Sequence, residues 1–142
     1  MALPGGYRLS LDPAELQLDA IHAYLVRSYW SPGIPKELVA KAIAHSVCIG
    51  AYAPDGAQVG FARLVTDHAT FGYLADVYVL EAHRGKGLSR AMVAALLALP
   101  EVRGFRRIML ATRDAHGLYE KLGFEPVTDP QPLMQILRKN LY

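Results

Sequence analysis

The segment that most constrains this chain joins an apolar strand, a basic loop with two glycines, and an amphipathic helix. The strand is expected over Phe71 to Leu80, and the loop reads Ala82-His83-Arg84-Gly85-Lys86-Gly87-Leu88-Ser89. Apolar side chains then repeat on one helical face until Pro100. Backbone N–H groups can converge at glycines, and a helix N-terminus carries about half a positive charge. With two basic side chains added, this arrangement predicts a phosphate-binding site.

Two common nucleotide-binding motifs do not fit this loop. A Walker A loop needs Gly, four residues, and then Gly-Lys-Ser/Thr, and the chain contains no such run. A dinucleotide fingerprint needs a third glycine where Arg90 stands, and it normally follows an early strand of a βαβ repeat. An ordinary tight turn with solvated basic side chains remains the structural alternative.

The hydrophobic pattern of the whole chain predicts one α+β domain over residues 1–142. Short apolar segments bounded by turn residues predict strands at 7–11, 47–53, 59–66, 71–80, 107–112, 124–127 and 133–139. Helical spacing predicts helices at 18–28, 35–43, 88–99 and 114–122. The strand–helix–strand unit between 71 and 112 implies a locally parallel pair.

Charge and cysteine content exclude several other classes of protein. Lys and Arg number 15 against 13 Asp and Glu, without a basic stripe, so we expect no nucleic-acid partner. No apolar run approaches the ~20 residues of a membrane span, so we expect no membrane partner either. The lone Cys48 excludes an internal disulfide, and the five histidines show no ligand spacing, so we expect no metal. Because the N-terminus lacks the layout of a signal peptide, we expect a cytoplasmic protein.

A second motif follows the basic loop after one helix and one strand, and it reads Ala115-His116-Gly117-Leu118-Tyr119-Glu120-Lys121-Leu122-Gly123-Phe124. In this order the two motifs resemble those of the GNAT superfamily of acetyl-CoA-dependent N-acetyltransferases. The loop matches Gln/Arg-x-x-Gly-x-Gly-x-Gly/Ala with departures at Ala82 and Ser89. The second motif matches Ala-x-x-Leu-Tyr-x-x-x-Gly-Phe, with Thr112 where an Asn is usual. The resemblance covers essentially the whole chain. It implies a three-layer α/β/α fold whose mixed, mostly antiparallel sheet contains a central splayed parallel pair.

The resemblance also implies acetyl-CoA as co-substrate and a binding place for each of its parts. The pantetheine arm is expected to pair with the strand backbone, and the Val77 N–H is expected to meet the thioester oxygen as a small oxyanion site. The side chains of Val77 and Val79 are expected in the core. The residues assigned to the cofactor are Val77, Val79, Arg84, Gly85, Lys86, Gly87, Leu88, Ser89 and Thr112.

Two residues are candidates for the chemistry. Tyr119 occupies the position of the family's general acid, and a phenol with a pKa of about 10 can protonate a departing thiolate. Packing beside Phe124 is its structural alternative. Asp76 lies in an apolar strand, one residue after Ala75, where carboxylate-bearing members have Glu. A bulge could turn Asp76 inward as a base or an anchor for the amine, and a structural hydrogen-bonding role is equally open.

The acceptor side is less defined by the sequence. Tyr29 and Trp30 lie in the loop where the family builds its acceptor pocket, and His22 lies on the preceding helix. We therefore predict acetyl transfer to a primary amine of a small molecule, peptide or protein, by direct attack in a ternary complex. The alternatives are a non-catalytic acyl-CoA-binding module of the same fold and a binder of phosphate esters or nucleotides. Family members often form homodimers through sheet edges, so the sequence leaves open whether this chain is a monomer or a homodimer.

Overall fold

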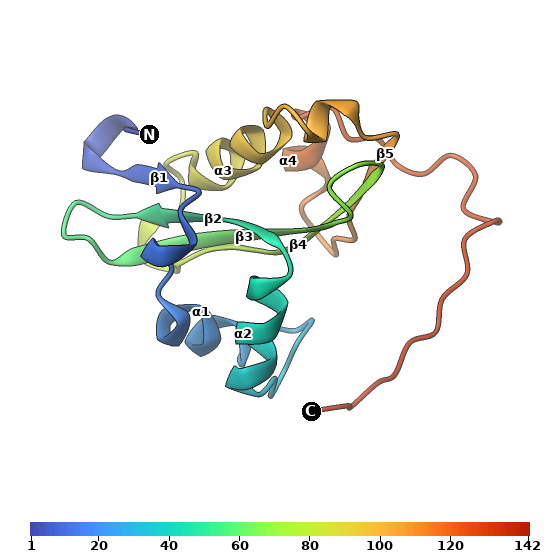
Figure 1. The fold of residues 1–142 in the computed structure, drawn as a ribbon, viewed down its shortest axis with the longest axis horizontal. Coiled ribbons are helices and arrows are strands. Elements are labelled where there is room, and N and C mark those ends of the chain that lie inside the picture. Colours follow the sequence, from blue (N-terminus) through green and yellow to red (C-terminus); the bar gives the residue numbers. More distant parts are fainter.

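The strands form one mixed sheet with the order β1-β2-β3-β4-β5 (Figure 1). The structure is a computed structural model that describes residues 1–142. Strands β1 to β4 pair antiparallel, and their bounds are Arg8–Ser10, Val47–Tyr52, Gln58–Thr66 and Phe71–Val79. Strand β5, Arg107–Met109, pairs parallel with β4. The expected meander followed by a parallel pair is therefore confirmed.

Helices cover both faces of this sheet (Figure 1). Helices α1 (Leu18–Leu25) and α2 (Lys36–Ala44) lie on one face, and α3 (Leu88–Leu97) and α4 (His116–Glu120) lie on the other. Short 3₁₀ turns occur at Pro4–Gly6, Pro13–Glu15, Glu81–His83 and Val102–Gly104. The three-layer α+β fold is confirmed. No helix in the structure combines the length and apolar character that a bilayer span needs.

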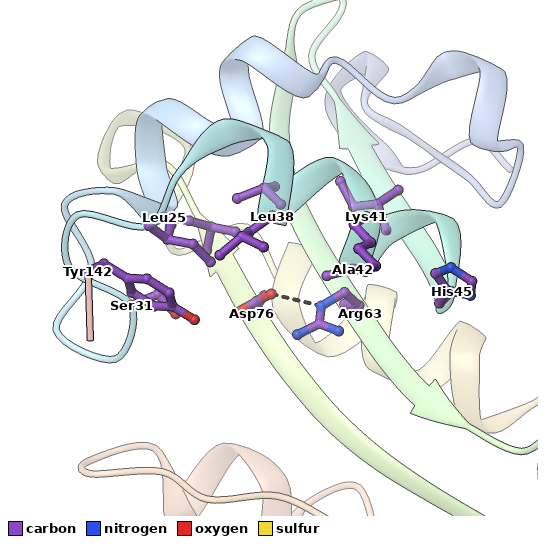
Figure 2. Close-up of a pocket in the computed structure, with 12 residues that line it drawn as sticks. Leu25, Ser31, Leu38, Lys41, Ala42, His45, Arg63, Asp76 and Tyr142 are labelled. Carbon is purple, nitrogen blue, oxygen red and sulfur yellow. Dashed lines mark hydrogen bonds and ion pairs between the residues drawn. The ribbon is translucent and has the colours of Figure 1, made fainter. Parts of the chain in front are cut away.

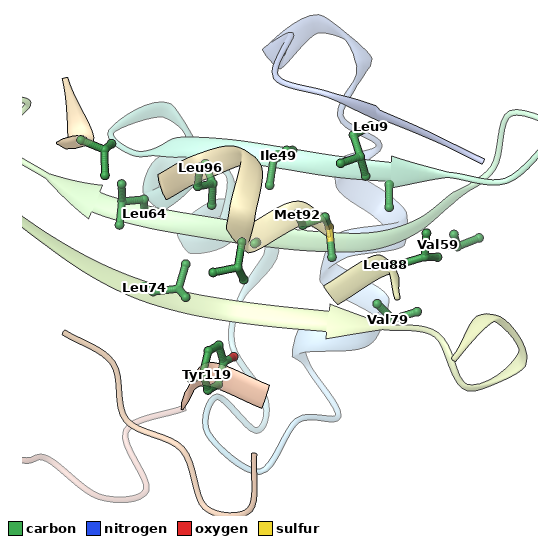
Figure 3. Close-up of a cluster of buried hydrophobic side chains, with 14 of the residues drawn as sticks. Leu9, Ile49, Val59, Leu64, Leu74, Val79, Leu88, Met92, Leu96 and Tyr119 are labelled. Carbon is green, nitrogen blue, oxygen red and sulfur yellow. The ribbon is translucent and has the colours of Figure 1, made fainter. Parts of the chain in front are cut away.

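The larger core lies between the sheet and α3 (Figure 3). Met92 and Leu96 of α3 are almost completely buried against Ile49 of β2 and Leu64 of β3. Burial of such a side chain contributes roughly 1.5–3 kcal/mol to the free energy of unfolding. A smaller cluster under α1 and α2 is built from Ile21, Leu25, Val39, Cys48, Phe61 and Tyr78. Helices thus pack against both faces of the sheet, and β4 lies in the middle layer.

The two strands expected after α4 are not formed, so those predictions were wrong for the chain by itself. Residues 124–127 and 133–139 pair with no neighbouring strand. A strand needs a partner for its N–H and C=O groups, and Pro126, Pro130 and Pro132 remove donors from this part of the chain. As a result, the β4–β5 pair lies at the end of the sheet.

Candidate active site

Strands β4 and β5 separate soon after they meet. Their register runs only from Phe71–Arg107 to Tyr73–Met109, whereas β4 continues to Val79. From Leu74 onward, the edge of β4 that faces β5 has no strand partner. The expected splay of the parallel pair is therefore present, and it exposes backbone N–H and C=O groups along β4.

A cavity of about 1190 Å³ opens at this splay. Its walls come from the α1–α2 loop, β4, the turn after β4, the start of α3, and residues 110–119. Most of the residues that the sequence singled out border this one space: Tyr29, Trp30, Asp76, Val77, Val79, Arg84, Ser89, Thr112 and Tyr119. Residues that are up to 90 positions apart along the chain thus share one candidate site.

The basic loop has the backbone geometry of an anion site. Gly85 and Gly87 both adopt positive φ, at 78° and 77°, a region that side-chain-bearing residues rarely enter. Gly87 is the N-cap of α3, and the first helical bond runs from the Ala91 N–H to the Gly87 carbonyl. The N–H groups of Leu88, Ser89 and Arg90 therefore have no partner within the helix. They offer donors to a ligand at the positive end of the helix dipole.

The side chains around the loop have different surroundings. The Arg84 Nε donates to the Val79 carbonyl at 3.0 Å, so this guanidinium is held against the end of β4 and lines the cavity. Lys86 lies outside the cavity lining, with its Nζ 6.0 Å from the centre of the Tyr7 ring. The Leu88 side chain is buried in the core, so only its backbone is available. Gly85 and Gly87 do not line the cavity either.

Tyr119 lies on α4 and is largely buried beside the cavity. Its ring packs edge-on against Phe124, with centroids 5.8 Å apart and planes at 75°. Its hydroxyl makes no hydrogen bond with another side chain or with the backbone. Burial raises the pKa of the Tyr119 phenol, and the nearby Tyr29 phenol adds to this effect. The phenol therefore stays protonated at neutral pH and can act as a proton donor.

Asp76 sits on a β-bulge in β4. Between the pairs Phe61–Tyr78 and Arg63–Ala75, one residue of β3 opposes two of β4, Asp76 and Val77. Asp76 adopts a φ of 55°, which costs a non-glycine residue roughly 1–3 kcal/mol. The bulge thus turns the carboxylate away from the position that strict alternation would give it.

Two donors hold the Asp76 carboxylate in place. The Arg63 Nε donates to Oδ2 at 2.8 Å, and the Trp30 Nε1 donates to Oδ1 at 2.9 Å. Figure 2 shows the Arg63–Asp76 ion pair in a second pocket of about 370 Å³, beneath α2. Both residues also line the larger cavity, so this ion pair forms part of the wall between the two spaces.

Aromatic side chains from the α1–α2 region and β4 form one wall of the cavity. Trp30 packs edge-on against Tyr29 at 5.0 Å between centroids, and Tyr24 stacks on Tyr78 at 4.0 Å. The Arg113 guanidinium lies 3.9 Å from the centre of the Tyr29 ring, which joins the α1–α2 loop to the segment after β5. The Tyr78 hydroxyl is buried and has no partner. This wall offers π faces and polar edges to a ligand.

Sequence reasoning missed Arg63, Tyr24, Tyr78 and Arg113 as parts of the site. The sequence did contain a signal for Arg63, because it is the single charged residue in a largely apolar strand. This strand forms a hairpin with the strand that carries Asp76. The two tyrosines and Arg113 come together only through the fold.

Three other residues named in the sequence analysis contact neighbouring parts of the fold. The His22 ring Nε2 lies 2.9 Å from the Ile34 carbonyl, and the residue lines neither the larger cavity nor the pocket beneath α2. The structure therefore does not bring His22 to the site, because its ring ties α1 to the loop before α2. Thr112 lines the cavity, and its hydroxyl accepts from the Ala115 N–H at 3.1 Å at the start of α4. Cys48 is buried in the core, and desolvation raises the pKa of its thiol to about 12.

Comparisons with known proteins agree with this geometry. The acetyltransferase (GNAT) family matches residues 44–124. A Gibberella zeae protein classed as an acetyltransferase is 37% identical, over 82% of this chain and 77% of its own length. A crystal structure of a GNAT-family acetyltransferase from Xanthomonas campestris pv. campestris is 47% identical and superposes with a TM-score of 0.91 over 96% of both chains.

An acetyltransferase of Clostridium acetobutylicum, solved with acetyl-CoA, shares the fold with a TM-score of 0.66 and 17% identity, over 92% of this chain and 94% of its own. The family match includes α3, the basic loop before it, the separating strands and Tyr119. The loop, the splay and the sequence relatives therefore lead to one conclusion: this chain belongs to the GNAT family of acetyltransferases.

Proposed function

We propose that this chain transfers an acetyl group from acetyl-CoA to a primary amine, by direct attack of the amine within a ternary complex. The observation that carries the proposal is the convergence on one cavity of an unpaired β4 edge, a helix N-terminus with free N–H groups, and a buried phenol. In this proposal the β4 edge pairs with the extended thioester, the helix N-terminus binds an anionic group, and the phenol donates a proton.

The cofactor side of the proposal rests on backbone groups. The free N–H groups at the start of α3, aided by Arg84 and Lys86, would hold the pyrophosphate. The open edge of β4 at Val77 and Val79 would pair with the pantetheine amides, with the Val77 N–H facing the thioester oxygen. When bound, acetyl-CoA supplies the activated acetyl group, as it does for other members of the family. Thr112 would contribute at the opposite wall of the same cavity.

Tyr119 would complete the reaction as the general acid. As the neutral amine nitrogen bonds to the thioester carbon, the carbon–sulfur bond breaks. The nitrogen gives its extra proton to water, and the leaving sulfur takes a proton from the acid. The Tyr119 hydroxyl has no competing partner, and its raised pKa keeps the proton in place until the thiolate forms. This role agrees with edge-on packing against Phe124, which orients the ring without using the hydroxyl.

Asp76 would anchor the acceptor amine. Its two oxygens already accept from Arg63 and Trp30, which hold the carboxylate at the junction of the two pockets while leaving further lone pairs free. A direct or water-mediated base role remains the alternative, and the two differ in their dependence on pH. Tyr29 and Trp30 would cover the acceptor through their π faces. A cytoplasmic location stays a prediction from the sequence.

The test is release of free CoA thiol from acetyl-CoA, measured with a panel of small-molecule and peptide amines and with amine-free controls. Amine-dependent thiol release with N-acetylated product supports the proposal. Tight binding of acetyl-CoA without release by any amine would favour a non-catalytic binding module. Competition by ATP as strong as that by CoA would instead indicate a general binder of phosphate esters.

A further inference from the structure

Arg63 and Asp76 are the only charged residues that line both the larger cavity and the pocket beneath α2 (Figure 2). Their side chains are only 18% and 10% exposed, and the Asp76 backbone holds a φ of 55°. A buried ion pair adds little net stability, because the loss of hydration offsets most of the attraction between the charges. The strained backbone at Asp76 adds a further cost. An ion pair that is costly to form and borders two cavities is a candidate for ligand recognition.

Each member of this ion pair keeps hydrogen-bonding capacity that the protein does not use. The Arg63 Nε donates to Asp76 Oδ2, and Nη1 donates to the Ser46 hydroxyl at 3.1 Å, whereas Nη2 donates to no group of the protein. Each Asp76 oxygen accepts one bond, from Arg63 or from Trp30, and has a further lone pair. A ligand that carries a cation and an anion side by side can therefore bind to both residues.

We propose that the acetyl acceptor is a free α-amino acid with an apolar side chain, an inference that rests on the proposed function. The amine of the amino acid binds Asp76, its carboxylate accepts from the Nη2 group of Arg63, and its side chain extends beneath α2. The Arg63 Nε and the Asp76 Oδ2 lie 2.8 Å apart, so the two protein charges are adjacent. An α-amino acid carries its own two charges on one carbon, so each of them can meet its opposite on the protein.

The pocket beneath α2 suits the side chain of such an amino acid. Its volume of about 370 Å³ lies within the range of roughly 300–1,000 Å³ that is typical of small-molecule sites. Asp76 is its only acidic residue, whereas Lys41 and His45 also line it, so a cationic side chain is disfavoured. Figure 2 shows apolar side chains of α1 and α2 gathered beside the ion pair. The apolar lining consists of Leu25, Ile34, Leu38, Val39, Ala42 and Ile43.

An amine that is held at Asp76 lies next to the place proposed for the thioester. Asp76 directly precedes Val77, whose N–H is assigned to the thioester oxygen, and both residues line the larger cavity together with Tyr119. The amine on the cavity side of Asp76 therefore faces the acetyl group. The nitrogen bonds to the acetyl carbon and gives its extra proton to water, while the departing sulfur takes the proton of Tyr119.

The same geometry disfavours the N-terminus of a peptide or protein as the acceptor. In a peptide, the carboxylate beside the amine is replaced by a neutral amide carbonyl. The Arg63 guanidinium would then lose its charged partner, and a hydrogen bond between two charged groups is roughly twice as strong as one between neutral groups. Recognition by Arg63 therefore separates free amino acids from peptides that begin with the same residue.

The first experiment compares L-leucine, leucinamide and isopentylamine as acceptors, which share a side chain and differ in the carboxylate. Release of CoA thiol and formation of N-acetylated product are measured across pH, so that differences in the pKa of the amines are separated from recognition. We expect kcat/KM for leucine to exceed that for the other two by roughly 10- to 150-fold, as for a hydrogen bond to a charged group. Equal use of all three would overturn the amino-acid assignment and leave acetyl transfer to amines standing. No turnover of any amine would overturn the proposed function itself, and this inference with it.

The second experiment tests Arg63 through the ratio of kcat/KM for leucine to that for leucinamide. Arg63→Gln should bring this ratio close to one, and a ratio is insensitive to a partial loss of folded enzyme. Arg63→Lys keeps the charge but removes Nη2, so it should also lower the ratio and serves if Arg63→Gln does not fold. Arg8→Gln is the matched control, because Arg8 also pairs with a carboxylate, that of Glu15, but lines neither space. A ratio that the Arg63 variants leave unchanged would show that Arg63 does not bind the carboxylate.

The third experiment tests where the side chain of the amino acid lies. Ala42→Leu places a larger side chain in the pocket beneath α2, so kcat/KM for leucine should fall about tenfold or more relative to that for alanine. Ala44→Leu is the same substitution on the same helix at an exposed position outside the pocket, and it should leave this preference unchanged. An unchanged preference in Ala42→Leu, or an equal loss in both variants, would contradict the placement beneath α2.

Discussion

The two sides of the candidate active site are built in different ways. The side proposed for the cofactor consists mainly of backbone: the open edge of β4, two glycines with positive φ beside the cavity, and the N–H groups at the start of α3. The side proposed for the acceptor consists of side chains that contact one another, with Asp76 between Arg63 and Trp30 and with Tyr29 beneath Arg113. A backbone site tolerates changes in neighbouring side chains, whereas a side-chain network fails or changes specificity when one member is replaced.

The largest effect is expected where the two sides meet, at Tyr119. Tyr119→Phe keeps the ring and its packing on Phe124 but removes the proton donor. We expect kcat to fall by about 10²- to 10⁴-fold. Affinity for CoA and thermal stability should change little, because the hydroxyl has no partner in the folded state. Steady-state kinetics measures kcat, and titration calorimetry measures the affinity for CoA.

The pH profile sharpens the assignment of Tyr119. Burial raises the pKa of this phenol above its usual value of about 10, so the acid form persists through neutral and moderately alkaline pH. If chemistry limits the rate, wild-type kcat should fall only above about pH 10, as the phenol loses its proton. Full activity of Tyr119→Phe under those conditions would assign the proton to water or to another group.

The next effect concerns the backbone side. Gly87→Val should abolish most of the stabilisation by CoA, which would otherwise reach about 2.7 kcal/mol at 100 times the dissociation constant. The substitution forces a β-branched residue into a φ of 77° and puts a side chain where the ligand approaches. Thermal unfolding with and without CoA measures the shift.

A matched control separates strain from loss of the site. Gly56 has a φ of 89°, has open space where a Cβ would lie, and belongs to the β2–β3 turn away from the cavity. Gly56→Val should lower the melting temperature in a comparable way and keep the CoA shift. If Gly87→Val kept the shift too, the pyrophosphate would not bind at this loop.

A smaller effect, dependent on pH, is expected for Asp76. Asp76→Asn removes the charge but keeps the shape, so the Trp30 bond survives while the ion pair with Arg63 is lost. An anchoring role predicts a raised acceptor KM at every pH at which the amine is charged. A base role predicts a fall in kcat that shrinks as pH rises and the amine loses its proton unaided. Unchanged acceptor kinetics at all pH values would leave Asp76 with a structural role alone.

The smallest effect is expected at Trp30. Trp30→Phe keeps an aromatic face but removes the N–H that holds Asp76, which is a hydrogen bond worth about 0.5–1.5 kcal/mol. We expect the KM for the amine to rise by roughly 2- to 12-fold and the KM for acetyl-CoA to stay constant. An equal change in both constants would contradict the separation of the two sides.

The sequence by itself determined the parts whose chemistry is local. Two glycines before an amphipathic helix specify the anion loop, because only glycine enters positive φ cheaply and the helix supplies the free donors. Alternation and turn residues specify β2, β3 and β4 within a residue or so of their ends. The family motif identified Tyr119. An acidic residue in an apolar strand needs an explanation, so a bulge that turns Asp76 inward was one of the alternatives that the sequence left open.

Only the tertiary structure decided how those parts are arranged. Arg63 and Trp30 reach Asp76 from 13 and 46 positions away, distances along the chain that no local pattern encodes. His22 looks like a pocket residue in sequence, but a carbonyl at 2.9 Å takes up its ring nitrogen. The pattern of residues 133–139 is that of a strand, yet none forms there, because pattern sets a preference while hydrogen-bonding partners decide whether a strand exists.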